Sequence, residues 1–397
     1  MTKSSKWSRT FPSETAQKYT GSPFFQDQLY FAYGSNLNSE DVRGYGRRHG
    51  ITNLRLDPVC VAYLPDMELA FNHTAFSRGG GALNIRPCVG QVVQGVVFRP
   101  TADQWAVLNS KEGCPSTYRK VAFHVLTLDG HSISITTFVL DEKRYEGHFI
   151  PPATDYKQIL YDGYKVHGLD TSILDAVTNG EKPTLFCDAI FAYGTLMRCE
   201  KRHALLTGCG KIECSLLAVA PGRLFDCGEY PAMMPATADG DFVRGEFIRL
   251  SADDMPAVLK AMDRIEGFRG HAESDASLFH RRLIESDVGD ERIRRAWVFI
   301  LASPPPDAPS IISGDWREHR GTRDRFVDRL IAAHCPEGTM KIVNALASRI
   351  PWSLSSDRQA VIENLIDLSA AVKSGELSER RLAQESGRWA VTIGGDG

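Results

Sequence analysis

Two glutamates, Glu112 and Glu266, each precede a glycine at the end of an amphipathic segment. Residues 101–113 and 251–267 place apolar side chains at helical spacing, so we expect helices that end at the glycine in the left-handed conformation. The negative end of a helix and apolar surroundings both disfavour a charged carboxylate. Each glutamate is therefore predicted to have a raised pKa and to accept and return a proton near neutral pH.

A tyrosine-glycine turn precedes each glutamate at a similar distance, since Glu112 lies 79 residues after Tyr33 and Glu266 lies 73 residues after Tyr193. Both turns follow a short apolar run, as expected where a buried strand delivers a tight loop. Backbone amides in such a loop can point at an anion, and glycine permits a close approach. The predicted binding residues are Tyr33, Gly34, Ser35, Asn36 and Leu37, and in the second half Tyr193, Gly194, Thr195, Leu196 and Met197. An acidic residue beside a C-cap glycine is ordinarily just solvated, but its recurrence behind the same turn favours a functional site.

The elements that must position these residues are read from periodicity and turn signals. In the first half we predict strands at 29–33, 58–63, 67–72, 80–85, 92–99, 121–128 and 131–140, and a helix at 155–167. The second half restarts with a strand ending at Tyr193 and a helix from about Cys199, followed by strands at 218–224, 243–250, 280–287 and 296–301. Strands and helices mix without regular βαβ alternation, so the predicted fold class is α+β. The predicted divisions are a lead-in at 1–27, domains at 28–182 and 186–316, and a helical C-terminal extension at 317–397.

Composition excludes several classes of function. The chain has 397 residues and a formal net charge of −3, without a basic block that could track a phosphate backbone, so neither nucleic acid nor a membrane surface is an expected partner. No apolar run reaches the roughly 18 residues of a membrane span. Nine cysteines without a CxxC pair indicate reduced thiols in the cytoplasm, and the histidines lack metal-ligand spacing, so no metal site is predicted. Arginines 281, 282, 292, 294 and 295 are interpreted as a solvated face, with the alternative that one of them contacts a carboxylate.

The first half resembles a γ-glutamylcyclotransferase, and the second half is similar to the AIG2-like branch of the same superfamily. The first resemblance rests on residues 30–37, 80–85, 95–98, 108–118 and 151–157. The second rests on residues 193–196, 222–224, 230–232, 243–246, 262–267, 279–282 and 313–316. The resemblance implies a small mixed β-barrel with flanking helices in each half, and neither a metal nor an organic cofactor.

The same resemblance implies a reaction in which the α-amine of a small γ-glutamyl substrate attacks its own γ-carbonyl and releases 5-oxoproline and a free amine. It assigns the proton transfers to Glu112 and Glu266, and makes Tyr118 and Tyr156 candidates for lining the first pocket. Asn109 stands where the family often has an aspartate, for which we expect a structural effect. Two alternatives stay open: one half is a non-catalytic binding or regulatory module, or both halves are structural descendants. The leaving amine and the oligomeric state are not indicated.

Overall fold

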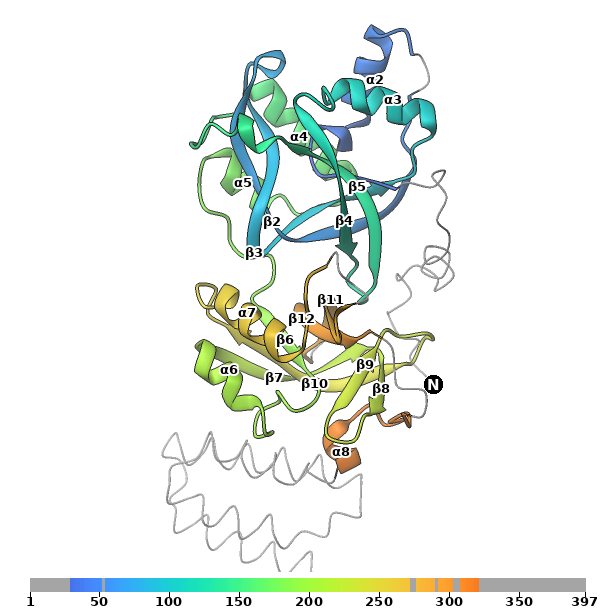
Figure 1. Cartoon of the computed structure of the whole chain (residues 1–397), viewed down its shortest axis with the longest axis vertical. Coiled ribbons are helices and arrows are strands. Elements are labelled where there is room, and N and C mark those ends of the chain that lie inside the picture. Colours follow the sequence, from blue (N-terminus) through green and yellow to red (C-terminus); the bar gives the residue numbers. More distant parts are fainter. Residues whose placement is uncertain (1–28, 52–53, 272–275, 290–291, 303–307, 321–397) are drawn as a thin grey trace, which may run out of the picture.

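The computed structural model describes residues 29–51, 54–271, 276–289, 292–302 and 308–320. They form two closed five-stranded barrels with flanking helices, which confirms the α+β class and the barrel architecture (Figure 1). The predicted lead-in at 1–27 lies outside the described residues, as does the predicted extension beyond helix α8 (Trp316–Arg320). None of the described helices is long and apolar enough to cross a bilayer.

The first barrel has the strand order β1-β3-β2-β4-β5. Its strands are β1 (Tyr30–Ala32), β2 (Pro58–Ala75), β3 (Gly80–Phe98), β4 (Tyr118–Leu126) and β5 (Ser132–Leu140). Its helices are η1 (Ser35–Leu37), α2 (Ser39–Arg48), η2 (Phe76–Arg78), α3 (Ala102–Lys111), η3 (Glu142–Arg144), α4 (Thr154–Val166) and α5 (Ser172–Thr178).

The second barrel has the strand order β10-β6-β12-β11-β7. Its strands are β6 (Ala189–Ala192), β7 (Ile212–Pro221), β10 (Phe242–Leu250), β11 (Phe279–Asp287) and β12 (Ile293–Leu301). The remaining elements are a separate hairpin, β8 (Arg223–Asp226) and β9 (Pro231–Met234), and the helices α6 (His203–Cys209), α7 (Met255–Ile265) and α8.

Both barrels close in the same way. The first strand of each runs antiparallel to one neighbour, with Ala32 opposite Val96 and Ala192 opposite Glu246. It runs parallel to its other neighbour, β5 in the first barrel and β12 in the second. The residue before Val96 and the residue before Glu246 are both glycines, because a Cβ at either position would lie 2.3 Å from the carbonyl oxygen of Ala32 or Ala192. The sequence repeat therefore corresponds to a repeated topology.

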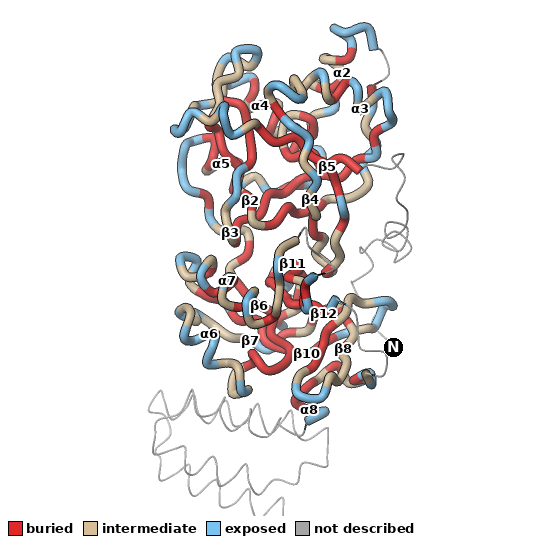
Figure 2. Tube along the Cα trace, viewed as in Figure 1, coloured by how far each residue is buried: buried red, intermediate tan, exposed pale blue. Residues whose placement is uncertain are grey.

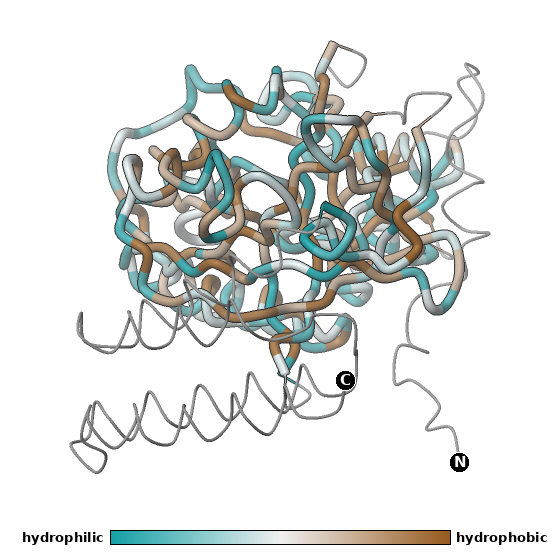
Figure 3. The backbone as a smooth tube through the Cα atoms, turned by 90° about the horizontal axis from the view of Figure 1, so that it is seen from below, coloured by the Kyte–Doolittle hydropathy of each residue, from teal (hydrophilic) through white to brown (hydrophobic). Residues whose placement is uncertain are grey.

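The cores follow from the residue pattern of these strands. Hydrophobic and hydrophilic residues alternate along the chain (Figure 3), and the buried residues follow the strands of both barrels (Figure 2). Phe31 and Phe191, at matching positions of β1 and β6, have 0% and 1% of their surface exposed. Each barrel thus has its own apolar centre around the strand that leads to its tyrosine-glycine loop.

The barrels lie end to end and are packed against each other (Figure 1). Tyr63, Val92 and Leu126 of the first barrel belong to the buried cluster of the second barrel. The backbone crosses the boundary as well, since the amide of Glu285 donates a 2.9 Å hydrogen bond to the carbonyl of Leu128. The interface is therefore an extension of the second core.

Three predicted elements need correction. Residues 58–63 and 67–72 are one strand, β2, because the Pro65-Asp66 pair forms a bulge with a register shift instead of a turn. The helix expected from Cys199 begins at His203, since Cys199 has a φ of 76° and ends a turn. The strand expected at 218–224 is divided between β7 and β8, which meet at Gly222 with a φ of 158°.

Candidate active sites

Both candidate glutamates cap the helix that precedes them. Glu112 is the C-cap of α3 and Glu266 is the C-cap of α7. The following glycines, Gly113 and Gly267, have φ angles of 60° and 63°, the left-handed conformation that the sequence predicts. The glycine caps therefore hold the backbone of Glu112 and of Glu266 in the same way in both barrels.

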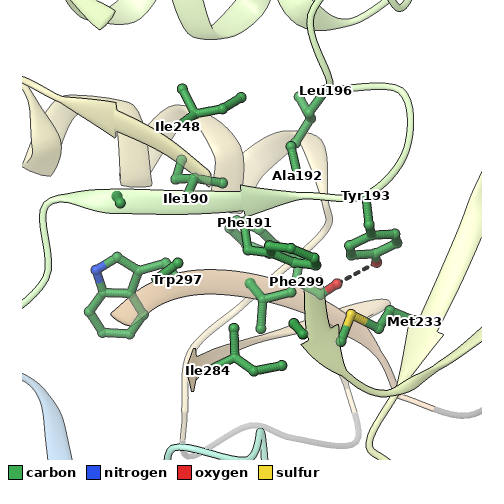
Figure 4. Packing of buried hydrophobic residues seen from close by; sticks show 14 of the residues in the cluster. Ile190, Phe191, Ala192, Tyr193, Leu196, Met233, Ile248, Ile284, Trp297 and Phe299 are labelled. Carbon is green, nitrogen blue, oxygen red and sulfur yellow. Dashed lines mark hydrogen bonds between the residues drawn. The ribbon is translucent and has the colours of Figure 1, made fainter. Parts of the chain in front are cut away.

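The two tyrosines of the loops are also held in the same way. The Tyr33 hydroxyl donates a 2.7 Å hydrogen bond to the carbonyl of Phe138 on β5. Tyr193 donates the corresponding bond to the carbonyl of Phe299 on β12 (Figure 4). Because each hydroxyl is bonded to the backbone of the neighbouring parallel strand, these tyrosines anchor the loops.

In the first site, one asparagine joins the loop to the glutamate. The Asn36 amide nitrogen donates hydrogen bonds of 2.8 Å to Glu112 Oε1 and 2.7 Å to the Tyr30 hydroxyl. Its amide oxygen accepts a 2.7 Å bond from Lys111 Nζ. The lysine thereby fixes the orientation of the amide, and the structure brings Asn36 and Glu112 into direct contact.

A charged cluster that the sequence analysis missed surrounds this contact. Arg78 binds Asp41 through two hydrogen bonds of 2.8 and 2.7 Å, and Lys111 Nζ lies 3.1 Å from Asp41 Oδ2. Burial raises the pKa of Asp41, but the Arg78 and Lys111 contacts outweigh it and bring that pKa to about 2. Both cations also donate to the Ser35 hydroxyl, at 3.3 and 3.1 Å. The adjacency of Lys111 and Glu112 in sequence was the available signal, whereas Arg78 and Asp41 are distant along the chain.

The remaining predicted residues of the first site divide into two groups. Tyr118 and Tyr156 bond the backbone of Leu83 at 3.2 and 3.3 Å. Burial is the main cause that raises the pKa of both phenols, to about 12 for Tyr156, and the charge of Glu112 adds to it. Leu37 instead is buried in the core, with 1% of its surface exposed.

The second site is an apolar cavity of about 90 Å³. Leu196 takes the place of Asn36 in the loop, and Ile265 takes the place of Lys111 before the glutamate. Burial raises the pKa of Glu266, as predicted, and the charge of Arg202 partly opposes the rise. The lining also includes Tyr193, Gly194, Thr195, Tyr230, Pro231 and Phe279. Among the predicted residues, Met197 does not line the cavity and is buried in the core.

A buried ion pair that the sequence analysis missed holds the chain just after the second loop. Glu246, with 1% of its surface exposed, accepts a 2.7 Å hydrogen bond from Arg317 and a 2.9 Å bond from the amide of Arg198. Arg317 also donates a 2.6 Å bond to the carbonyl of Arg198. Val96 occupies the position of Glu246 in the first barrel, so this contact is specific to the second site.

The prediction of a solvated arginine face is wrong for two residues. Arg281 and Arg282 have 1% and 9% of their surface exposed. Arg281 points at Asp66 of the first barrel, so the interface between the barrels buries it. Within the described residues, no group of three or more His, Cys, Asp and Glu side chains could hold a metal ion.

Comparison with known proteins gives a consistent result for both halves. A family model described as "Gamma-glutamyl cyclotransferase, AIG2-like" matches residues 30–158 and again residues 190–318. A gamma-glutamylcyclotransferase from Homo sapiens is 32% identical over 146 residues, which cover 36% of this chain and 72% of that protein. The corresponding protein of Mus musculus has the same identity and coverage. A solved "Gamma-glutamyl cyclotransferase" structure aligns with a TM-score of 0.34 and 28% identity, over 40% of this chain and 89% of that chain.

Proposed function

Because the chain belongs to the γ-glutamyl cyclotransferase, AIG2-like family, we propose that it converts a γ-glutamyl amide or amine into 5-oxoproline and a free amine. The observation that carries this proposal is the repeated pairing of a glycine-capped glutamate with a tyrosine-glycine loop in two barrels of the same topology. The named relatives support it for a stretch about as long as one of the two domains, since their alignment spans 146 residues.

In the proposed mechanism the glutamate carboxylate first takes a proton from the α-ammonium of the substrate. The free amine then adds to the γ-carbonyl carbon, and a C–N bond forms as the carbonyl becomes a tetrahedral oxyanion. Backbone amides of the tyrosine-glycine loop stabilise this oxyanion. The intermediate collapses with cleavage of the original C–N bond, and the glutamic acid returns its proton to the departing nitrogen. The carboxylate then takes the second proton from the ring nitrogen and passes it to the released amine, which leaves as an ammonium ion. Ring closure within one molecule benefits from orientation, which can be worth about 7–11 kcal/mol at best.

The polar groups suggest how each barrel aims its glutamate. Asn36 would keep Glu112 directed at the loop through its 2.8 Å hydrogen bond. In the second barrel the raised pKa of Glu266, caused by burial, would favour the return of the proton to the leaving amine. We propose that both glutamates act in this way and that the two sites differ in the substrates they accept.

The test is production of 5-oxoproline by the full chain from γ-glutamyl dipeptides and from γ-glutamyl amines. Glu112→Gln and Glu266→Gln each remove one proton shuttle while keeping the shape of the side chain, and each is expected to lower turnover at its own site by about 10²–10⁴-fold. Glu142→Gln is the matched control, because its side chain is 74% exposed on the first barrel. Absence of 5-oxoproline with every substrate, or full turnover in the double variant, would overturn the proposal.

A further inference from the structure

The first barrel touches the helix that carries Glu266. A Cβ on Gly90 of β3 would lie 3.4 Å from Leu259 and 3.9 Å from Pro256, both on α7. The amide of Gly90 also donates a 2.9 Å hydrogen bond to Asp66. Asp66 is the bulged residue of β2, with a φ of 57°, and a bulge re-aims a side chain out of its regular direction. Here the bulge directs the Asp66 carboxylate at the second barrel.

The partner of Asp66 is the buried Arg281 of β11. The Arg281 guanidinium donates a short hydrogen bond to Asp66 and lies between the rings of Phe268 and Trp297, at 5.2 and 5.0 Å from their centres. His271 lies 3.6 Å from the same carboxylate. A buried cation without a counter-charge is costly, so the carboxylate of Asp66, which belongs to the first barrel, stabilises Arg281.

The second terminal nitrogen of the Arg281 guanidinium lies near the end of α7. Arg281 NH1 lies 3.5 Å from Asp263 Oδ2, and Asp263 precedes Glu266 by one helical turn. The carbonyl of Asp263 accepts the amide of Phe268 at 2.8 Å, a bond that closes the helix around Glu266 and Gly267. Contacts therefore run without interruption from Asp66 to the backbone that presents the second glutamate.

Among the described residues of the first barrel, the equivalent positions are occupied differently. Asn109, which is uncharged, takes the place of Asp263 three residues before its glutamate. Lys120 takes the place of Arg281, since the two residues lie opposite Phe138 and Phe299, and it is exposed over the ring of Trp105. The ion pairs of Arg281 with Asp66 and Asp263 are therefore specific to the second site.

We propose that Asp66 is a positioning residue for the second-barrel site, acting through Arg281 and Asp263 on the end of α7 that presents Glu266. The inference rests on the proposed function only for the role of Glu266. Asp66 does not touch the substrate, and its carboxylate acts by holding Arg281 against Asp263. The second site is thus completed by the first barrel, although all the residues that line its cavity come from the second.

The activity test uses the full chain with Asp66→Asn, which keeps the size of the side chain and an oxygen for the Gly90 amide but removes the charge. In a Glu112→Gln background, where only the second site turns over, kcat is expected to fall on the order of tenfold with a much smaller change in KM, since the proton shuttle is displaced and binding is not. In a Glu266→Gln background the same substitution leaves first-site turnover unchanged. Asp57→Asn is the matched control, because its side chain is 80% exposed on the same barrel.

A second measurement is independent of turnover. Hydrogen exchange of the α7 peptide, residues 255–268, is expected to become on the order of tenfold faster in Asp66→Asn, while the α3 peptide, residues 102–112, is unaffected. Asp66→Glu keeps the charge and is expected to restore most of the protection. Unchanged exchange in α7, or equal acceleration in both helices, would overturn the inference. Absence of turnover in Glu112→Gln would instead contradict the proposed function of the second half, and the exchange comparison alone would then decide the inference.

Discussion

The ion pair between Glu246 and Arg317 gives a quantitative prediction for the second barrel. Arg317→Met removes the cation 2.7 Å from a carboxylate that has 1% of its surface exposed. An uncompensated buried charge of this kind costs about 3–5 kcal/mol. With an m-value of about 2 kcal/mol/M, the urea midpoint of unfolding falls by roughly 2 M. The carbonyl of Arg198 loses its hydrogen-bond donor as well, so turnover at the second site is expected to fall together with the stability of the barrel.

Urea unfolding followed by tryptophan fluorescence measures the effect. Glu246→Gln together with Arg317→Met removes both charges but keeps an oxygen for the Arg198 amide, so the double variant is expected to recover most of the lost stability. Arg320→Met, an exposed change on the same helix, serves as the control and stays within about 0.5 kcal/mol of the wild type. A cost below about 1 kcal/mol for Arg317→Met, or a double variant no more stable than the single one, would refute the reasoning.

Two further predictions concern the cavity of the second site. Arg202→Gln removes the charge that lowers the pKa of Glu266, so more of the carboxyl is protonated at a given pH and the acid limb of the pH–rate profile moves to higher pH. Arg202→Lys keeps the charge and is the control. An acid limb that stays in place in Arg202→Gln would contradict the assignment. Gly194→Ala places a Cβ 2.5 Å from the Pro231 ring, which lines the cavity, and is expected to lower second-site kcat/KM at least about tenfold. Gly208→Ala on α6 is the control in the same barrel, because a Cβ there would meet no atom within 4 Å, and a comparable loss in that variant would show that the cavity wall is not responsible.

The parts of the site that depend on local sequence were predictable. A glycine after an amphipathic segment specifies a left-handed cap, and Gly113 and Gly267 both adopt it. The turn at Tyr33-Gly34 and its copy at Tyr193-Gly194 were identified for the same reason, since a strand that ends in glycine gives a signal within a few residues.

The charged surroundings of the glutamates were not predictable in this way, because their partners come from distant segments. Asp41 and Arg78 belong to α2 and η2, and only the closed barrel brings them to Lys111. The misassigned Arg281 had a usable signal, since it shares the period of two with Phe279 and Leu283, which are buried on β11. What the pattern could not supply was the nearer of the two carboxylates that contact Arg281, Asp66, because it belongs to the other barrel.

The bulge at Asp66 has a consequence for the order in which the two barrels fold and pack together. Barrel closure joins residues far apart along the chain, with Tyr33 and Tyr193 bonding carbonyls 105 and 106 positions later. Each barrel must therefore be nearly complete before it can close, and domains generally fold as units from the N-terminal end during synthesis. We therefore expect Asp66 to be in place on a folded surface before Arg281 leaves the ribosome. The first barrel then acts as a template, because the buried cation of the later half meets a counter-charge that was synthesised before it.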